Sequence, residues 1–207
     1  MLVVRPSRRH VALHPRRAGE AMSQSNTHRE ALIASSHDGR HDRRMGTVYE
    51  AAGGKDGLCS LARAWHRRVM ADEVVSHAFS HGFHPQHVER LAAYWGEALG
   101  GPRTYSNGHG DETTVVKMHS GNGKHDEMDR RAIDCFDQAL ADVGLADDAV
   151  LRQVLHDYFA WATTTTMARY HRSAEDVPNG LSIPRWSWDG LQPSEIPSQP
   201  SPSPAAP

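Results

Sequence analysis

Three widely spaced histidines are the residues of this chain best suited to chemistry. His119 closes the run Thr-Thr-Val-Val-Lys-Met-His, and the helix-breaking run Ser-Gly-Asn-Gly follows it. His87 lies 32 residues earlier in the chain, and His66 precedes both. Imidazole nitrogens are the commonest metal ligands in proteins. One of these imidazoles could hold a metal ion, and another could face that ion across a flat cofactor.

Amphipathic helices would position these side chains. From Thr47 onward, apolar residues recur at spacings of three and four, which is typical of helices with one buried face. The predicted helices cover residues 47–52, 56–70, 72–78, 85–99, a brief stretch ending at 118–119, 124–143 and 149–172. Residues 103–112 are predicted to form a loop. His87 shares the apolar stripe of its helix with Leu91, so its side chain is expected to point inward.

The predicted core is all-α, because no strand pattern competes with the helical one. The periodicity divides the chain into a disordered N-terminal extension (1–44), a helical domain (45–174) and a Pro/Ser-rich C-terminal tail (175–207). Within the tail, Trp186 and Trp188 are expected to pack their indoles on the helical domain. Residues 193–207 are expected to stay disordered.

The charge of the chain is unevenly distributed. Residues 1–44 hold nine arginines and four acidic residues, a balance of +5, whereas the remaining 14 basic and 21 acidic residues give −7. An acidic body without a basic stripe argues against nucleic-acid binding by the folded domain. The extension lacks the apolar centre of a secretory signal. Translation starting at Met45 is the alternative to a basic extension.

Two further compositional features bound the class of protein. No apolar run approaches the roughly 20 residues that span a bilayer, so a membrane protein is not expected. The two cysteines, Cys59 and Cys135, cannot form a disulfide framework and fit a reducing compartment. The predicted location is therefore the cytoplasm.

Several short motifs, in this order, carry a family resemblance. They are Tyr49-Glu50-Ala51-Ala52-Gly53-Gly54, Ala71-Asp72-Glu73-Val74, Glu89-Arg90-Leu91, Gly100-Gly101-Pro102-Arg103-Thr104-Tyr105-Ser106 and Met118-His119. Over residues 48–169 the chain resembles a group II truncated haemoglobin. The resemblance implies a 2-on-2 helical sandwich with haem b bound between the middle helices. Covalent attachment is not expected, because the chain has no Cys-x-x-Cys-His motif.

The resemblance also assigns roles to individual residues. It implies that His119 is the proximal ligand, whose second ring nitrogen would need an acceptor that the sequence does not identify. His87 would stand on the distal side, next to Leu91, and donate a hydrogen bond to a bound diatomic molecule. His66 takes the position at which the family usually has a tyrosine. Phe79 would pack on the haem edge, and Lys117 would reach a propionate.

The chain departs from the family pattern at two places. The tryptophan typical of the group, on the helix after the proximal histidine, corresponds to Ala132 in this chain. The usual proline-phenylalanine pair after the proximal histidine is replaced by the run from Ser120 to Gly123, which is expected to loosen that side. Ligand chemistry therefore transfers poorly from the family. The resting iron is expected to be either five-coordinate or bound by His66 or His87 as a sixth ligand.

Three functions compete. The leading one is reversible binding of O₂ and other small diatomic molecules at haem iron. The second is haem-dependent oxidoreductase chemistry, peroxidase-like or nitric-oxide dioxygenase, with an external reductase because the chain lacks a Gly-x-Gly-x-x-Gly motif after a strand. The third is a non-haem metal site built from the closely spaced histidines His77, His81, His84 and His87.

Overall fold

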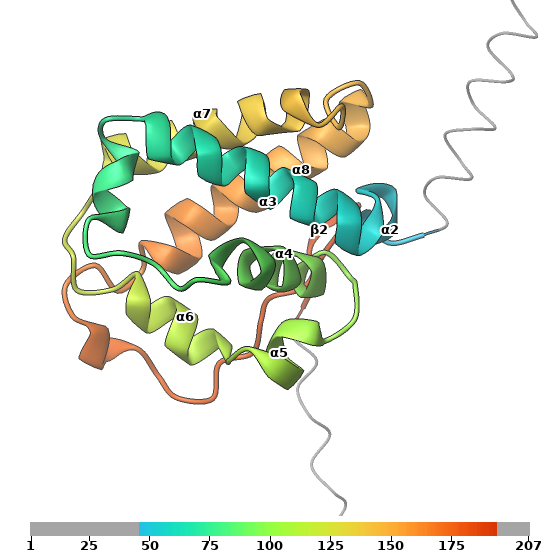
Figure 1. The fold of residues 1–207 in the computed structure, drawn as a ribbon. Helices are drawn as coiled ribbons and strands as arrows, with labels where there is room; N and C mark the ends of the chain where they lie inside the picture. Colours follow the sequence, from blue (N-terminus) through green and yellow to red (C-terminus); the bar gives the residue numbers. More distant parts are fainter. Residues whose placement is uncertain (1–45, 194–207) are drawn as a thin grey trace, which may run out of the picture. The chain divides into compact units, whose positions relative to one another are not determined.

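The computed structural model of the chain describes residues 46–193, most of which are helical (Figure 1). The predicted extension at residues 1–44 and the end of the predicted tail lie outside the described residues. The longer helices are α3 (Gly54–Ala71), α4 (His87–Ala98), α7 (Asp126–Asp142) and α8 (Ala149–Trp161). The shorter elements are α2 (Val48–Ala51), η1 (Val75–Phe79), α5 (Thr104–Gly108), α6 (Glu112–Met118) and η3 (Ala174–Asp176). No helix within residues 46–193 is long and apolar enough to cross a membrane.

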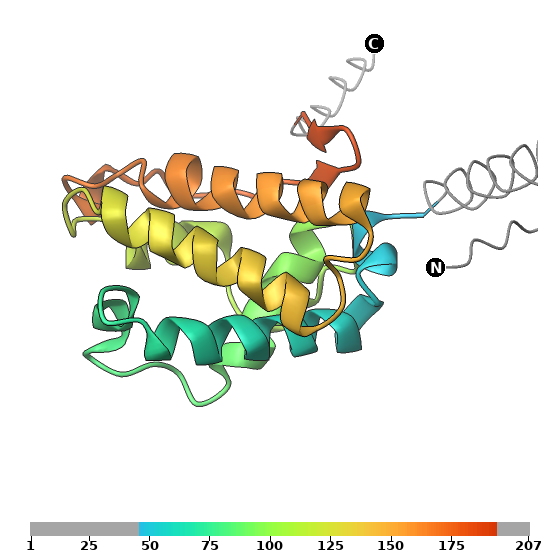
Figure 2. The ribbon, with the colours of Figure 1, turned by 90° about the horizontal axis from the view of Figure 1, so that it is seen from above.

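The four longer helices form two packed pairs. Helix α3 packs closely against α4, and α7 packs against α8. The pairs are joined mainly by α3 and α7, which lie side by side in both ribbon views (Figures 1 and 2). The predicted all-α fold of two helices on two is therefore confirmed.

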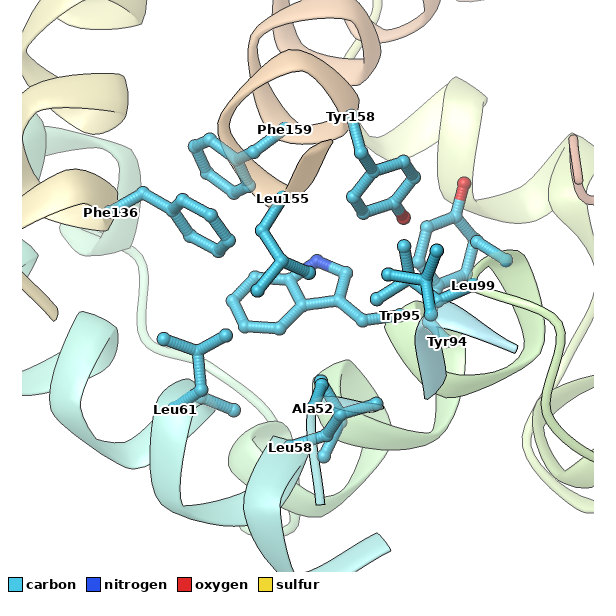
Figure 3. Packing of buried hydrophobic residues seen from close by; sticks show 14 of the residues in the cluster. Ala52, Leu58, Leu61, Tyr94, Trp95, Leu99, Phe136, Leu155, Tyr158 and Phe159 are labelled. Carbon is cyan, nitrogen blue, oxygen red and sulfur yellow. The ribbon is translucent and has the colours of Figure 1, made fainter. Parts of the chain in front are cut away.

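An aromatic core holds these layers together (Figure 3). The rings of Phe136 and Phe159 stack, with centroids 4.1 Å apart and planes 5° from parallel. The indole of Trp95 meets both rings edge-on, at 5.4 and 5.7 Å. Leu61 and Leu155 are fully buried around them. Burying each such side chain stabilises the fold by about 1.5–3 kcal/mol, so α3, α4, α7 and α8 have one preferred arrangement.

The glycine pair after α4 is required by a close approach to α2. A Cβ atom added to Gly101 would lie 2.7 Å from both the carbonyl oxygen of Gly96 and the ring of Tyr49. Gly100 has a φ of +95°, a conformation that other residues rarely adopt. This geometry explains why the motif that carries the family resemblance contains two glycines in a row.

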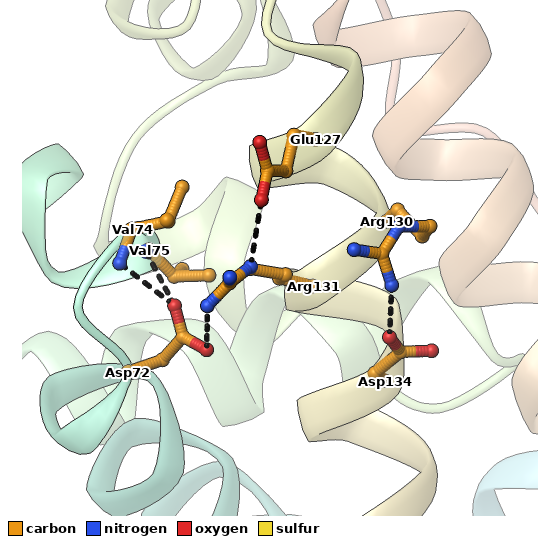
Figure 4. A network of polar contacts seen from close by, with 7 residues as sticks. All are labelled: Asp72, Val74, Val75, Glu127, Arg130, Arg131 and Asp134. Carbon is orange, nitrogen blue, oxygen red and sulfur yellow. Dashed lines mark hydrogen bonds and ion pairs between the residues drawn. The ribbon is translucent and has the colours of Figure 1, made fainter.

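A polar network fixes the turn between α3 and η1 (Figure 4). The amides of Val74 and Val75 both donate to Oδ1 of Asp72, each over 2.9 Å. Oδ2 of Asp72 accepts a hydrogen bond from Arg131 of α7 over 3.2 Å. These partners lower the pKa of Asp72, the backbone amide of Val75 most of all. The network ties α7 to η1, the element that carries Phe79.

The prediction was wrong in three local features. The last predicted helix ends as an α-helix at Trp161 and continues as a π-helix over Ala162–Met167. The hydroxyl of Thr164 there donates to the carbonyl of Ala160 over 2.8 Å, and such bonds bend helices. The predicted loop at 103–112 contains α5, and two short strands, β1 (Trp186–Ser187) and β2 (Gly190–Leu191), form a hairpin.

Candidate functional site

His119 is held by its own helix. Asp111 caps α6 by accepting a hydrogen bond from the amide of Thr114 over 2.8 Å, and His119 follows the last turn. Nδ1 of His119 lies 2.8 Å from the carbonyl oxygen of Val115. A carbonyl oxygen only accepts, so Nδ1 carries the proton and donates. In the neutral ring the lone pair then lies on Nε2, and this is the form of imidazole that ligates metals.

Four rings gather where α3, η1 and the start of α4 meet. The ring of His66 lies 5.2 Å from that of His87, 5.5 Å from Phe79 and 4.7 Å from Phe83, measured between centroids. Phe79 and Phe83 lie 5.4 and 5.7 Å from His87. We call His66, Phe79, Phe83 and His87 the aromatic cage. The structure thus brings together three predicted site residues that lie on different elements.

The cage keeps both of its imidazoles neutral. Burial lowers the pKa of His66 and lowers that of His87 to about 4. Positive charge on His66 or on His119 would lower the pKa of His87 further. Nδ1 of His66 and Nε2 of His87 are buried, and neither has a hydrogen-bond partner among the described residues. Two unpaired ring nitrogens in one apolar cage are the feature of this site that calls for a ligand, since such groups are normally satisfied.

The remaining predicted residues have separate surroundings. Leu91 is half-buried and packs against the hydrophobic core from α4. Lys117 is exposed on α6, with Nζ 3.4 Å from Oδ1 of Asn179, so its contact with a propionate stays a prediction. The sequence analysis did not identify Phe83 as a site residue, because it lies in a short loop without helical periodicity. Its place between His81 and His84 was the one indication in the sequence that it could belong to the site.

A different tryptophan, Trp65, lies next to Ala132, the position at which the family usually has a tryptophan. Ala132 is buried, and its carbonyl oxygen accepts a hydrogen bond from the indole nitrogen of Trp65 over 3.1 Å. Trp65 belongs to α3 and precedes His66 in the chain. Its ring also meets Phe79 edge-on at 6.5 Å. The large aromatic side chain beside position 132 is therefore supplied by α3, and its N–H is already used by the backbone.

The loop after His119 is bonded to a distant part of the chain. The amide of Gly121 donates to the carbonyl of Tyr170 over 3.0 Å, and that of Gly123 donates to the carbonyl of His171 over 2.9 Å. Ser120 is buried and its hydroxyl donates to the carbonyl of Val116 over 2.7 Å. Three hydrogen bonds, from Ser120, Gly121 and Gly123, thus hold the run that replaces the proline-phenylalanine pair.

The alternative of a non-haem metal site has no support in residues 46–193. No group of three or more His, Cys, Asp or Glu side chains in this range is arranged to hold a metal ion. His77, His81 and His84 are exposed, and only His87 of the four closely spaced histidines turns into the cage. Within residues 46–193 these four histidines therefore do not converge on one metal position.

Comparison with known proteins gives one family and several similar structures. Residues 47–163 match the family model described as bacterial-like globin, which covers more than half of the chain. The hemoglobin of the thermophilic phototrophic bacterium Chloroflexus aurantiacus has 26% identity and a TM-score of 0.51, over 60% of this chain and 99% of that one. The thermostable hemoglobin of the actinobacterium Thermobifida fusca has 30% identity and a TM-score of 0.50, over 59% and 97%.

A third structure is similar in fold alone. The group II truncated hemoglobin of Bacillus anthracis has 20% identity and a TM-score of 0.51, over 59% of this chain and 90% of that one. No curated protein matches the chain. The similarity therefore supports a family and a fold, and the roles of single residues must be argued from their geometry.

Proposed function

Because the chain belongs to the bacterial-like globin family, a family of haem proteins, we propose that it holds haem b through Nε2 of His119 and reversibly binds O₂ and other small diatomic molecules. The observation that carries this proposal is the hydrogen bond between Nδ1 of His119 and the carbonyl of Val115. In the neutral ring this bond places the proton on Nδ1 and the lone pair on Nε2, and it fixes the plane of the ring, as a haem ligand requires.

The side chains of the site fit the cofactor. The imidazole of His119 is the donor type that globins use for haem iron. The cage offers an apolar macrocycle the rings of Phe79 and Phe83, whose centroids lie 5.9 Å apart, and it holds two unpaired imidazole nitrogens. When bound, haem supplies an iron centre that binds a diatomic molecule and exchanges electrons. The chain supplies the fixed ligand, the apolar walls and the hydrogen-bond donors.

His87 is the proposed distal donor. Its low pKa keeps the ring neutral at physiological pH, so it carries one N–H and one lone pair. A hydrogen bond from this ring to a diatomic ligand would form inside an apolar cage, where such bonds are stronger than in water. His66 lies 5.2 Å away between ring centroids and is the second candidate donor. Either ring could instead occupy the sixth position of the iron in the resting protein.

Haem-dependent oxidoreductase chemistry is the second candidate function. The observation in its favour is again the neutral His87, because an unprotonated imidazole in the cage can accept a proton from peroxide. Such turnover would draw electrons from a separate reductase.

We propose the cytoplasm as the location of the protein. The free thiols of Cys59 and Cys135 are compatible with its reducing conditions.

Gas binding by the ferrous, haem-loaded protein tests the proposal. We expect its visible spectrum to change on exposure to O₂ and to return when O₂ is removed. His87→Leu should speed O₂ release about tenfold, since a hydrogen bond to a polar ligand contributes about 1–1.5 kcal/mol. The matched control is His81→Leu on the exposed loop, which should leave the rate unchanged. A ferrous protein that shows no reversible spectral response to O₂ would rule out this function.

A further inference from the structure

Helix α6, which precedes His119, depends on other parts of the chain for its position. It has only seven residues, and isolated helices of that length are unstable in water. Among the helices and strands, η3 packs most closely against it. Element η3 belongs to the segment of residues 170–181, which lies beyond the part of the chain matched by the family model. We call residues 170–181 the proximal strap.

The proximal strap is bonded to the first turn of α6 through Thr113. This side chain is buried, with 8% of its surface exposed. Its hydroxyl oxygen accepts a hydrogen bond from the amide of Leu181 over 3.1 Å and donates one to the carbonyl of Pro178 over 3.3 Å. One hydroxyl therefore pairs with both a backbone N–H and a backbone carbonyl of the strap. An apolar side chain at position 113 would leave both groups without this partner.

The strap also holds the other end of α6. The loop after His119 donates from Gly121 and Gly123 to the carbonyls of Tyr170 and His171. Between these two attachments the strap is anchored to the body by Val177, which is 4% exposed. Figure 1 shows this orange-red segment running along α6. Both ends of the helix are thus fixed by the same stretch of chain.

The geometry points to the proximal strap as the element that sets the direction of His119 toward haem iron, with Thr113 as its positioning residue. This inference rests on the proposed function. Because Nδ1 of His119 is bonded to Val115, the imidazole turns with α6, and any shift of α6 against the strap moves Nε2. The strap would therefore act on a metal held by Nε2 through the position of α6 and of the His119 ring.

Resonance Raman spectroscopy of the ferrous, haem-loaded protein tests this role through the iron–histidine stretching band. Thr113→Val removes the hydroxyl at nearly constant shape, and Thr113→Ser retains it. We expect the band to shift or broaden in the valine variant and to return in the serine variant. Haem loss to an apoglobin acceptor should be about tenfold faster in the valine variant, equivalent to about 1.4 kcal/mol. The matched control is Thr165→Val, at an exposed threonine of the π-helix.

The outcomes separate this inference from the proposed function. A visible spectrum of the ferrous, haem-loaded protein that is unchanged in His119→Gly would refute the assignment of His119, and the strap role would fall with it. A wild-type band that stays unchanged in Thr113→Val, whatever the melting temperature, would refute the strap role alone. If Thr113→Val does not fold, Thr113→Ala makes the same test, because alanine favours the helix while removing the hydroxyl. An unchanged band in that variant is equally a refutation.

Discussion

Glu112 is a buried carboxyl group on α6 whose ionisation should make stability depend on pH. Its side chain is 2% exposed, and Oε2 accepts a hydrogen bond from the hydroxyl of Tyr94 over 2.8 Å. Oε1 is buried without a partner among the described residues. Burial raises the pKa of Glu112 to about 7, against the opposing effect of the Tyr94 hydrogen bond, and the negative charges of Asp111 and Glu97 raise it further.

The magnitude follows from the difference between folded and unfolded chains. The ordinary pKa of this carboxyl group is 4.5, so the folded state favours its neutral form. At about 1.4 kcal/mol per pH unit, the gap amounts to about 3 kcal/mol. This contribution is fully present below pH 4.5 and is lost as the pH rises through 7. At pH 8 the folded protein carries the whole cost of a buried carboxylate.

Glu112→Gln removes this cost, because the amide is neutral at every pH and still offers an oxygen to Tyr94. Urea unfolding at matched haem occupancy should give equal free energies of unfolding for variant and wild type at pH 4.5. At pH 8 the variant should be more stable by about 3 kcal/mol. Glu73→Gln, at an exposed position, is the control and should change neither value. Parallel stability curves for Glu112→Gln and wild type from pH 4.5 to 8 would refute the reasoning.

Three further substitutions test the architecture. Asp72→Asn should lower the melting temperature at pH 7, and the difference from wild type should shrink as the pH falls below 3.8, because the lowered pKa of Asp72 gives stability that is present above 3.8 and is lost as the pH falls through the folded-state pKa. Trp188→Phe removes the indole bond to the carbonyl of Gly46 and should cost about 1 kcal/mol in urea unfolding. Gly101→Ala should cost about 1–3 kcal/mol through its clash, whereas Gly108→Ala, with open space around it, should be neutral or stabilising. Equal melting temperatures for the two alanine variants would contradict the account of the turn.

The sequence predicted those parts of the fold that depend on local periodicity and capping. The apolar stripe of α4 placed His87 and Leu91 on an inward face, and the predicted helical segment at residues 72–78 overlaps η1. The indoles of Trp186 and Trp188 pack against the core, as expected from the apolar residues in an otherwise polar tail. The two helical features follow from residues within about two helical turns of one another, where spacing determines which side chains share a face.

Other features depend on contacts that spacing does not contain. The bond from His119 to Val115 requires a particular side-chain rotamer at the end of a helix. The bonds of Thr113 to the proximal strap join residues that lie more than 60 positions apart in the chain. In the π-helix after Trp161, the hydroxyl of Thr164 bonds to the carbonyl of Ala160, and the apolar spacing does not indicate this bond. Periodicity identifies the buried face of a helix, but it does not identify the partner that covers it.

The most direct test of the central claim is haem titration of wild type and His119→Gly, followed by visible absorption. We expect wild type to take up one haem per chain and to develop an intense Soret band. The glycine variant should lose the normal band and regain it when free imidazole is added, because the small ligand can fill the space of the missing ring. A glycine variant whose band matches that of wild type without imidazole would contradict the account.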